Sequence, residues 1–431
     1  MMRSIGLDCH LEFIEVAILD AAGAHVSAGR IESSGEAIRL FAEGLGADDR
    51  VALESSANAA AIAALIRPHV AEVVIANSRR LAQISQARAK TDRLDARTLA
   101  KLLRAGALQE VWAPDARTRA RRRLCSRRAA LVRARTRAKN EAHAVLARNL
   151  KGRPPATDLF GRAGRRWLAA LELPADERLT VDACLRQVDF LSAEIAELER
   201  LASADLIDDE DAHRLLTIPG VGPQATLALL AAIGDVSRFG SARQLVAYLG
   251  LDPRVRQSGS GEARHGRISK QGPAQARAAL VEAAQQAMRQ PGPLRAFGAR
   301  IRARRGYQVA AVAVARKLAC LAWQLLTRGE DYAFERPQLT QRKLRRLELA
   351  AGAPRRRGKA NGAPSKDPQR EAAEREAAER AEAAYRRLVA DWKASGARSA
   401  RAGAGAPRGR ASRGPSKGPA ARQATAPDPA L

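Results

Sequence analysis

Apolar and polar positions follow two different periods along the first 111 residues, and each change of period predicts a new element. Apolar runs at Ile5–Cys9 and Phe13–Leu19 predict two strands, and the second run is followed by a turn that ends in Gly23. A third strand is predicted near His25–Ile31. A segment with helical spacing then extends to about Leu45, and Ser34, which precedes it, is a good N-cap for a helix.

The same stretch continues with two more strands and one more helix. We predict a strand at Val51–Glu54, an alanine-rich helix from about Asn58 to Ile66, and a strand at Val73–Ala76. Three consecutive strands followed by helix, strand, helix and strand is the element order of an RNase H-like α/β fold. We therefore expect an α/β domain over residues 1–111, and its acidic residues must decide its type.

Residues 112–205 have the heptad spacing of a helical region. Apolar residues recur every seventh position in its first half, at Leu124, Leu131, Ala138 and Val145. In its second half they follow steps of three and four, at Val181, Cys184, Val188, Leu191, Ile195 and Leu198. This pattern predicts a short coiled coil, and the alternative is two helices packed within one chain. Between Arg117 and Arg153 the only acidic residue is Glu141, which predicts a helix that lies along phosphates.

Residues 206–335 are expected to form a compact, mainly α-helical domain with a helix-hairpin-helix. The segment Leu215–Pro223 contains Gly220 and Gly222, which allow a tight turn whose backbone N–H groups can face a phosphate. The positive N-terminus of the following helix would support such an anion. The alternative is an ordinary Gly-Pro turn between core helices, and the basic composition of the chain favours DNA binding.

The remainder, residues 336–431, is rich in Ala, Arg, Gly, Pro and Ser and predicts a basic low-complexity tail. Within it, four residues form one apolar helical stripe: Tyr385, Leu388, Val389 and Trp392. From about Ser395 onward the composition predicts disorder. Such a tail would add affinity for nucleic acid that does not depend on base sequence.

The net charge points to a polyanionic partner. The 431 residues include 74 Lys and Arg against 46 Asp and Glu, a formal net charge of +28. Nucleic acid is the simplest partner for such a protein, and an acidic membrane surface is the second. The sequence contains no run of about 18 apolar residues, so we expect no membrane-spanning segment. The first residues lead into a predicted strand and do not resemble a signal peptide. The scattered cysteines (Cys9, Cys125, Cys184 and Cys320) predict reduced thiols in a cytoplasmic protein and no zinc site.

Four carboxylates stand where the predicted fold would bring them together. Asp8 and Glu54 are at the ends of strands that neighbour each other in an RNase H-like sheet. Asp92 and Asp95 are three apart and share one face of a helix. Each acid alone could be a capping or surface residue, but together they favour a site for Mg²⁺ or Mn²⁺, which prefer oxygen ligands. Two such ions can promote cleavage of a phosphodiester.

A glycine-rich loop after Pro253 combines serines with cations. Ser258 lies among five basic residues that we expect to contact nucleic acid: Arg254, Arg256, Arg264, Arg267 and Lys270. A hydroxyl that attacks phosphorus needs the negative charge of the transition state neutralised. Ser260 and Ser269 compete with Ser258 for this role, and composition does not choose among the three.

These motifs resemble the DEDD transposases of the insertion-sequence-110 family, which include the site-specific invertase Piv. The resemblance covers about residues 4–330. Asp8, Glu54, Asp92 and Asp95 fall on the four acids of the family's RuvC-like catalytic domain, the last two within the motif at Lys90–Arg97. Ser258 falls on the nucleophilic serine of the family's C-terminal transposase domain.

The resemblance implies a transposase or site-specific recombinase that cleaves DNA through a phosphoserine link and then exchanges strands. It also implies Mg²⁺ or Mn²⁺ at the acids, and a homodimer or tetramer that acts on element ends and target DNA. Some members also use a structured guide RNA encoded by the element. The basic helix at Arg117–Arg153 is our candidate for contacts with the backbone of RNA or DNA.

Two short segments depart from the family's pattern. Cys9-His10-Leu11 follows Asp8 where the family often has a small residue and Ser-Lys, and Ser55–Asn58 replaces the usual Ala-Thr-Gly and aromatic residue after Glu54. Both departures leave the acidic ligands in place but change the residues expected to line the pocket. The alternative functions are a RuvC-like junction-resolving nuclease that uses a metal-activated water, and a non-catalytic nucleic-acid-binding protein.

Overall fold

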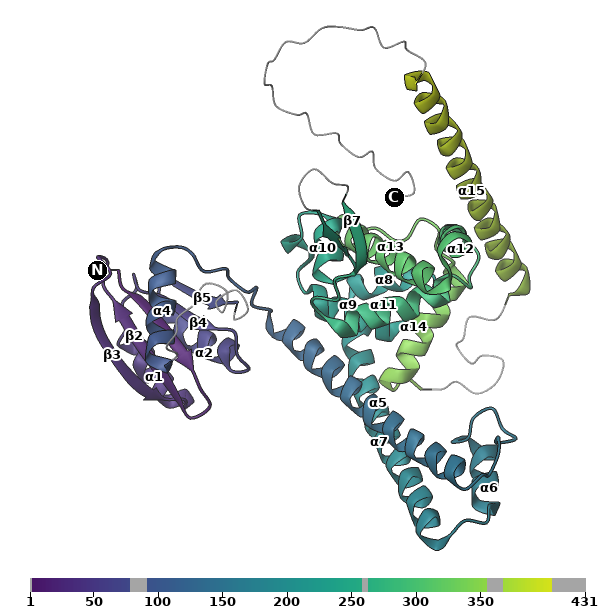
Figure 1. Cartoon of the computed structure of the whole chain (residues 1–431), viewed down its shortest axis with the longest axis horizontal. Coiled ribbons are helices and arrows are strands. Elements are labelled where there is room, and N and C mark those ends of the chain that lie inside the picture. Colours follow the sequence, from purple (N-terminus) through teal and green to yellow (C-terminus); the bar gives the residue numbers. More distant parts are fainter. Residues whose placement is uncertain (1, 78–90, 258–262, 355–366, 405–431) are drawn as a thin grey trace. The chain divides into compact units, whose positions relative to one another are not determined.

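The computed structural model describes residues 2–77, 91–257, 263–354 and 367–404. The chain divides into two compact units, residues 1–115 and residues 116–431. The first unit is built on a β-sheet, and the second consists mainly of helices (Figure 1).

A five-stranded mixed sheet forms the centre of the first unit. Its order is β3 (His25–Glu32), β2 (Phe13–Leu19), β1 (Ser4–Cys9), β4 (Arg50–Glu54) and β5 (Glu72–Ala76). The first three strands in the chain pair antiparallel, whereas β4 is parallel to both β1 and β5. The predicted order of strands and helices is confirmed, with α1 (Gly35–Glu43) before β4 and α2 (Ala59–Ile66) with η1 (Arg67–His69) before β5.

Helices cover both faces of this sheet. Ser34 caps α1 as predicted, since its hydroxyl accepts a hydrogen bond of 3.3 Å from the N–H of Ala37. On one face, α1 and α2 bury Ile38 and Ile62 against strand residues such as Leu7. On the other face, the core includes α4 (Asp92–Arg104) and small residues of β4 and β5. The sheet is therefore the middle of three layers (Figure 1).

Two long antiparallel helices begin the second unit. They are α5 (Ala116–Arg148) and α7 (Ala175–Ile207), joined through α6 (Arg162–Ala170). Ion pairs at opposite ends of the hairpin, Arg117 with Asp205 and Arg148 with Glu177, show that the helices are antiparallel. The buried heptad residues of the two helices include Leu131, Ala138, Val145, Val181, Cys184, Val188 and Ile195. The structure thus shows the alternative of packing within one chain, while a coiled coil between chains stays a prediction.

The remaining elements form a helical body around one core. They are α8 (Glu210–Thr217), α9 (Pro223–Ile233), η2 (Val236–Arg238), α10 (Ala242–Tyr248), β6 (Pro253–Arg256), β7 (Arg264–Ile268), α11 (Ala274–Ala287), α12 (Pro293–Arg305), α13 (Tyr307–Arg328), α14 (Pro337–Ala351) and α15 (Pro368–Ala404). By length and composition α13 is the one helix in the described ranges that could cross a membrane. It is half-buried and packs against α10, α11 and α12, as the core helix of a folded domain does.

Two helices occupy much of the predicted low-complexity tail. In α15, the predicted stripe is partly buried, because Tyr385 and Val389 pack against Ala296 of α12 while Trp392 stays exposed. This helix continues to Ala404, beyond the point near Ser395 where we expected order to end. Ion pairs at helical spacing, such as Arg380 with Glu376, contribute to its stability.

Candidate functional site

The acidic residues Asp8 and Glu54 lie at the carboxyl ends of two neighbouring parallel strands. Leu7 of β1 pairs with Leu53 of β4, so the next residue on each strand is an acid. Ala52 belongs to the cluster under α4, and because side chains alternate along a strand, Glu54 lies on that same face. Asp8 shares this face with Gly6, directly under α4.

A glycine allows α4 to approach the sheet closely enough to meet Asp8. A β-carbon on Gly6 would lie 1.9 Å from the carbonyl oxygen of Ala96 and 2.7 Å from the nitrogen of Ala100, both in α4. Thr91 caps this helix with a hydrogen bond of 3.4 Å from the N–H of Leu94. The first turn, which carries Asp92 and Asp95, is thereby held beside the end of β1.

The closest group of potential ligands contains a histidine that our sequence analysis treated only as a departure from the family's pattern. His10 Nε2 lies 3.2 Å from Asp8 Oδ2 and 3.5 Å from Asp92 Oδ2. The ligand atoms of these three residues all lie within 4.8 Å of one another. Glu54 and Asp95 are not members of this tight group.

Electrostatic effects connect the other two acids to the same place. Burial raises the pKa of the Asp8 carboxyl, His10 opposes the shift, and the charges of Asp95 and Asp92 add to it. Burial also raises the pKa of the Cys9 thiol to about 12, with further contributions from Asp8 and Glu54. Carboxylates that disfavour one another's charge are typical of sites that hold a cation.

A second buried acid, which sequence reasoning missed, is neutralised by the protein itself. Glu15 of β2 is the cross-strand partner of Asp8 and is only 4% exposed. Arg30 of β3 donates a hydrogen bond of 2.7 Å from Nε to the Glu15 carboxylate, and its guanidinium lies over the ring of Phe13. Asp8 and Asp92, in contrast, both lie beside the imidazole of His10. The uncompensated charge at this edge of the sheet therefore comes from the predicted acids.

The donor set fits a divalent metal ion. Carboxylate oxygens at the rim of a sheet, with one imidazole nitrogen in reach, are ligands that Mn²⁺ accepts, and the oxygens alone suit Mg²⁺. The residues of the tight group are buried or half-buried, which leaves an approach for a substrate from solvent.

The predicted serine loop connects two antiparallel strands, β6 and β7. Ser258 and Ser260 lie outside the described residues. The strands that flank the loop place Arg256 directly opposite Arg264, and both side chains are exposed. Like charges directly opposite each other destabilise a strand pair unless an anion lies between them.

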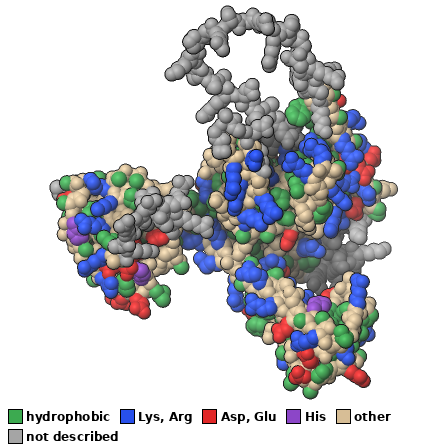
Figure 2. All heavy atoms as spheres, viewed as in Figure 1, with side chains coloured by type: hydrophobic (Ala, Val, Ile, Leu, Met, Phe, Trp, Pro, Cys, Tyr) green, Lys and Arg blue, Asp and Glu red, His purple; other side chains and the backbone are tan. Residues whose placement is uncertain are grey.

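The other predicted cations lie on the same hairpin or just after it. Arg254 donates a hydrogen bond of 3.2 Å to the carbonyl oxygen of Ser269, while Arg267 and Lys270 are exposed. In the described parts of the chain, none of the five predicted cations forms an ion pair. Figure 2 shows many Lys and Arg side chains on this face of the second unit, over β7 and α13.

The two hairpin glycines between α8 and α9 have different surroundings. Gly220 has a φ of +92°, and a β-carbon there would lie 2.5 Å from the carbonyl oxygen of Ala283 in α11. Close packing against α11 therefore requires this glycine, whatever the hairpin binds. Gly222 caps α9, and a β-carbon there would meet nothing within 4 Å.

Two protein-family models match this chain. A model for DEDD transposases of the IS110 type, described as "Transposase", matches residues 5–149 and includes the acidic cluster. A second model, described as "Transposase IS116/IS110/IS902 family", matches residues 212–299 and includes the glycine hairpin and the serine loop. The chain belongs to the IS110 family of DEDD transposases. Residues 5–149 and 212–299 thus match the two family models in the order that the resemblance predicted.

Several curated proteins are similar to this IS110-family chain over part of its length. A probable family 20 transposase of Pseudomonas aeruginosa is 34% identical over 214 residues, which cover 48% of this chain and 62% of that protein. The transposase for insertion sequence element IS1111A of Coxiella burnetii is 38% identical over 140 residues, covering 32% and 37%. A pilin gene-inverting protein of Moraxella bovis is 45% identical over 69 residues, covering 16% and 21%. The match thus spans less than two thirds of these relatives' length.

Proposed function

We propose that this protein is the transposase of an insertion sequence, which cleaves DNA at element ends and target and rejoins the strands. The main support is the cluster of Asp8, His10 and Asp92, whose ligand atoms lie within 4.8 Å of one another. It occurs in the part of the chain that a DEDD transposase model matches. In this proposal residues 1–111 are an RNase H-like, RuvC-like catalytic domain.

Asp8, Glu54, Asp92 and Asp95 would hold Mg²⁺ or Mn²⁺. The ion would supply positive charge to the oxygens of the phosphodiester during its cleavage. Asp8 is the buried anchor of the set, and α4 presents Asp92 and Asp95 from its first turn. His10, between Asp8 and Asp92, would orient both carboxylates or take a place among the ligands.

Ser258 would be the nucleophile. Its Oγ would form a bond to phosphorus while the bond from phosphorus to a deoxyribose oxygen breaks, and the proton of the serine would end on that leaving hydroxyl. The reverse reaction with a hydroxyl from a second DNA would complete strand exchange, since each bond broken is replaced by one of the same kind. Arg254, Arg256, Arg264, Arg267 and Lys270 would neutralise charge on the phosphate.

The regions between and after the two sites would bind nucleic acid and partner chains. In α5 several arginines face solvent rather than α7: Arg123, Arg127, Arg133 and Arg137. These would contact the backbone of DNA or of a guide RNA, within a helical region at residues 112–205. A coiled-coil contact of that region would assemble a homodimer or tetramer. The helix-hairpin-helix at Gly220 and Gly222 would bind DNA within residues 206–335. The basic residues of 336–431, which include helices α14 and α15, would add to this affinity.

Trapping of a covalent intermediate tests the proposal. The full chain is incubated with Mg²⁺ or Mn²⁺ and DNA that carries its own element ends, then denatured and examined for a protein–DNA adduct. We expect an adduct with the native chain and with the matched Ser260→Ala and Ser269→Ala variants. Ser258→Ala should form none, and Asp8→Asn should neither cleave nor form an adduct.

The same experiment separates the alternatives. A Ser258→Ala variant that still cuts DNA would contradict the serine step and support the junction-resolving nuclease. A native chain that binds its element ends but never cuts them would contradict the transposase and support the non-catalytic binder. An adduct formed by the Ser258→Ala chain and lost with Ser260→Ala would move the nucleophile to Ser260.

A further inference from the structure

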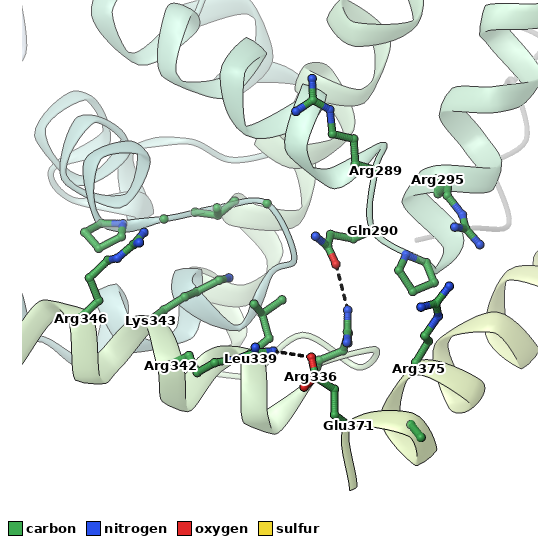
Figure 3. Close-up of a pocket in the computed structure, with 16 residues that line it drawn as sticks. Arg289, Gln290, Arg295, Arg336, Leu339, Arg342, Lys343, Arg346, Glu371 and Arg375 are labelled. Carbon is green, nitrogen blue, oxygen red and sulfur yellow. Dashed lines mark hydrogen bonds and ion pairs between the residues drawn. The ribbon is translucent and has the colours of Figure 1, made fainter. Parts of the chain in front are cut away.

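A strongly basic cavity of about 860 Å³ lies in the second unit, away from the β6–β7 hairpin. It opens between the glycine hairpin, the turn after α11, and helices α14 and α15 (Figure 3). Seven Lys and Arg side chains line it, against a single carboxylate, that of Glu371. The excess of positive charge remains after the ion pairs of the lining are considered.

Some of the lining cations are compensated by nearby acids. Arg342 pairs with Glu371 at 3.0 Å, and Arg295 pairs with Glu382 of α15 at 2.7 Å. Arg289, in the turn after α11, and Arg346, in α14, are exposed and form no ion pair in the ranges that the structure describes. Two exposed cations thus line the cavity with no acidic partner in the described part of the chain.

Arg336 provides a buried cation aimed into the cavity. It is only 7% exposed, and it extends from the start of α14 toward Gln290, to whose Oε1 it donates a hydrogen bond of 2.9 Å (Figure 3). Its Nε is buried and has no hydrogen-bond partner among the described residues. A buried guanidinium without a carboxylate is costly, so this arrangement favours an anionic ligand.

The N-terminus of α9 also faces this cavity. Gly222 caps the helix without a side-chain hydrogen bond, and Pro223 occupies its first turn. Gly220, Val221, Gly222 and Pro223 are all part of the cavity lining. Free backbone N–H groups and the helix dipole at such an end attract an anion.

Lys343 has a structural role in the same lining. Its Nζ donates hydrogen bonds of 2.6 and 2.7 Å to the carbonyl oxygens of Leu216 and Ile218. It therefore fixes α14 to the end of α8, which sets the width of the cavity. The groups left to contact a ligand are Arg289, Arg336, Arg346 and the N-terminus of α9.

We propose that this cavity extends the nucleic-acid site of the glycine hairpin, and that it holds backbone phosphates between that hairpin and α14. Helices α14 and α15 begin after residue 299, where the match to the second family model ends, so the C-terminal extension completes the site. The choice of nucleic acid as the polyanion rests on the proposed function. The site itself needs neither a metal ion nor Ser258.

Binding in the absence of metal tests this proposal separately from catalysis. Labelled duplex DNA, single-stranded DNA and RNA of equal length are titrated with the full chain in EDTA over a range of salt concentrations, and fluorescence anisotropy is recorded. The test chain carries Arg289→Glu and Arg346→Glu. The matched control carries Arg243→Glu and Arg387→Glu, the same charge change at exposed positions of α10 and α15 that lie outside the cavity.

We expect the test chain to bind at least one of these nucleic acids about tenfold or more weakly than the control chain. Its slope of log affinity against log salt should fall by about two, as expected for two lost phosphate contacts. If the loss of affinity is larger for DNA than for RNA, or the reverse, the more affected nucleic acid is the one whose backbone occupies the cavity. Equal affinities and slopes for test and control chains with all three nucleic acids would overturn the proposal.

Arg336 gives a second, independent test. Arg336→Met should weaken binding of the same nucleic acid. Arg336→Lys should retain part of the affinity because it keeps the positive charge. Unfolding curves of both variants report whether each chain is folded. An Arg336→Met chain that is folded and binds like the native protein would contradict the role of Arg336. Since no step requires cleavage, a failed adduct experiment leaves this result intact, and the reverse also holds.

Discussion

Gly6 lies directly beneath the backbone of Ala96, so that α4 crosses β1 with no side chain between them. This contact sets the distance between Asp8 on the strand and the two acids in the first turn of the helix. A single small residue thus determines whether acids far apart in the chain meet.

Substitution of Gly6 by alanine should therefore damage the first unit. The added β-carbon would lie 1.9 Å from the carbonyl oxygen of Ala96, so α4 must shift, at a cost of about 1–3 kcal/mol. Hydrogen exchange of the β1 and α4 amides in the full chain measures this loss. Gly29→Ala, in exposed strand β3 where a β-carbon meets nothing within 4 Å, is the matched control and should leave exchange unchanged. Unchanged exchange in Gly6→Ala would show that α4 does not pack closely against Gly6.

Replacement of Asp8 by asparagine should stabilise the metal-free protein while it abolishes metal binding. Burial and the charges of Asp95 and Asp92 disfavour the Asp8 carboxylate, so a neutral side chain removes that penalty. We expect a gain of about 0.5–2 kcal/mol in EDTA, the usual exchange of function for stability. Hydrogen exchange of β1 with and without Mn²⁺ measures both effects. A loss of stability in EDTA would indicate that the His10 contact outweighs the repulsion.

His10→Ala tests whether the imidazole contributes to metal binding. Because imidazole is a poor ligand for Mg²⁺ and a better one for softer ions, the variant should lose more affinity for Mn²⁺ than for Mg²⁺. A loss of about tenfold or more for Mn²⁺, measured by calorimetry, is the expected result. His25→Ala, exposed at the start of β3, is the control. Equal losses for the two ions would assign His10 to orienting the carboxylates.

The sequence predicted the strands of the sheet well because they depend on local patterns. Alternating apolar residues define β1 and β2, and a parallel register places Asp8 beside Glu54 once the order of elements is known. The contact of His10 with Asp92 could not be predicted because it depends on where α4 packs against β1. The Glu15–Arg30 pair could not be predicted because it depends on the register between β2 and β3.

The charge of α5 shows the same limit. Composition predicted a helix that lies along phosphates, yet part of its positive charge is used within the chain. Arg121, for example, is buried between Asp205 and Asp209 at the end of α7. Only the packing of the helices decides which arginines remain for a ligand.

Lys343 predicts a pH dependence of the second unit's stability. Burial lowers the pKa of Lys343 to about 7, whereas an unfolded lysine keeps its ordinary value near 10.5. Between these values the unfolded chain binds the extra proton, so this residue makes stability rise as the pH increases from 7 toward 10. The neutral amine still has two hydrogens for the carbonyls of Leu216 and Ile218.

Comparison with Lys343→Met isolates this effect from the titration of other groups. The unfolding free energy of the native chain minus that of the Lys343→Met chain should increase by about 1 kcal/mol or more from pH 7 to pH 9. Urea unfolding at several pH values measures it, and the exposed Lys101→Met gives the baseline. A difference that stays constant with pH would show that the ammonium remains charged between its two carbonyls.

The proposed metal site is tested most directly by anomalous diffraction at the manganese edge from crystals of the native chain soaked in Mn²⁺. We expect a peak within ligand distance of the Asp8 and Asp92 carboxylates, and its loss in Asp8→Asn crystals. Native crystals with no manganese near these residues, from a protein that still cleaves DNA with Mn²⁺, would contradict the proposed metal site.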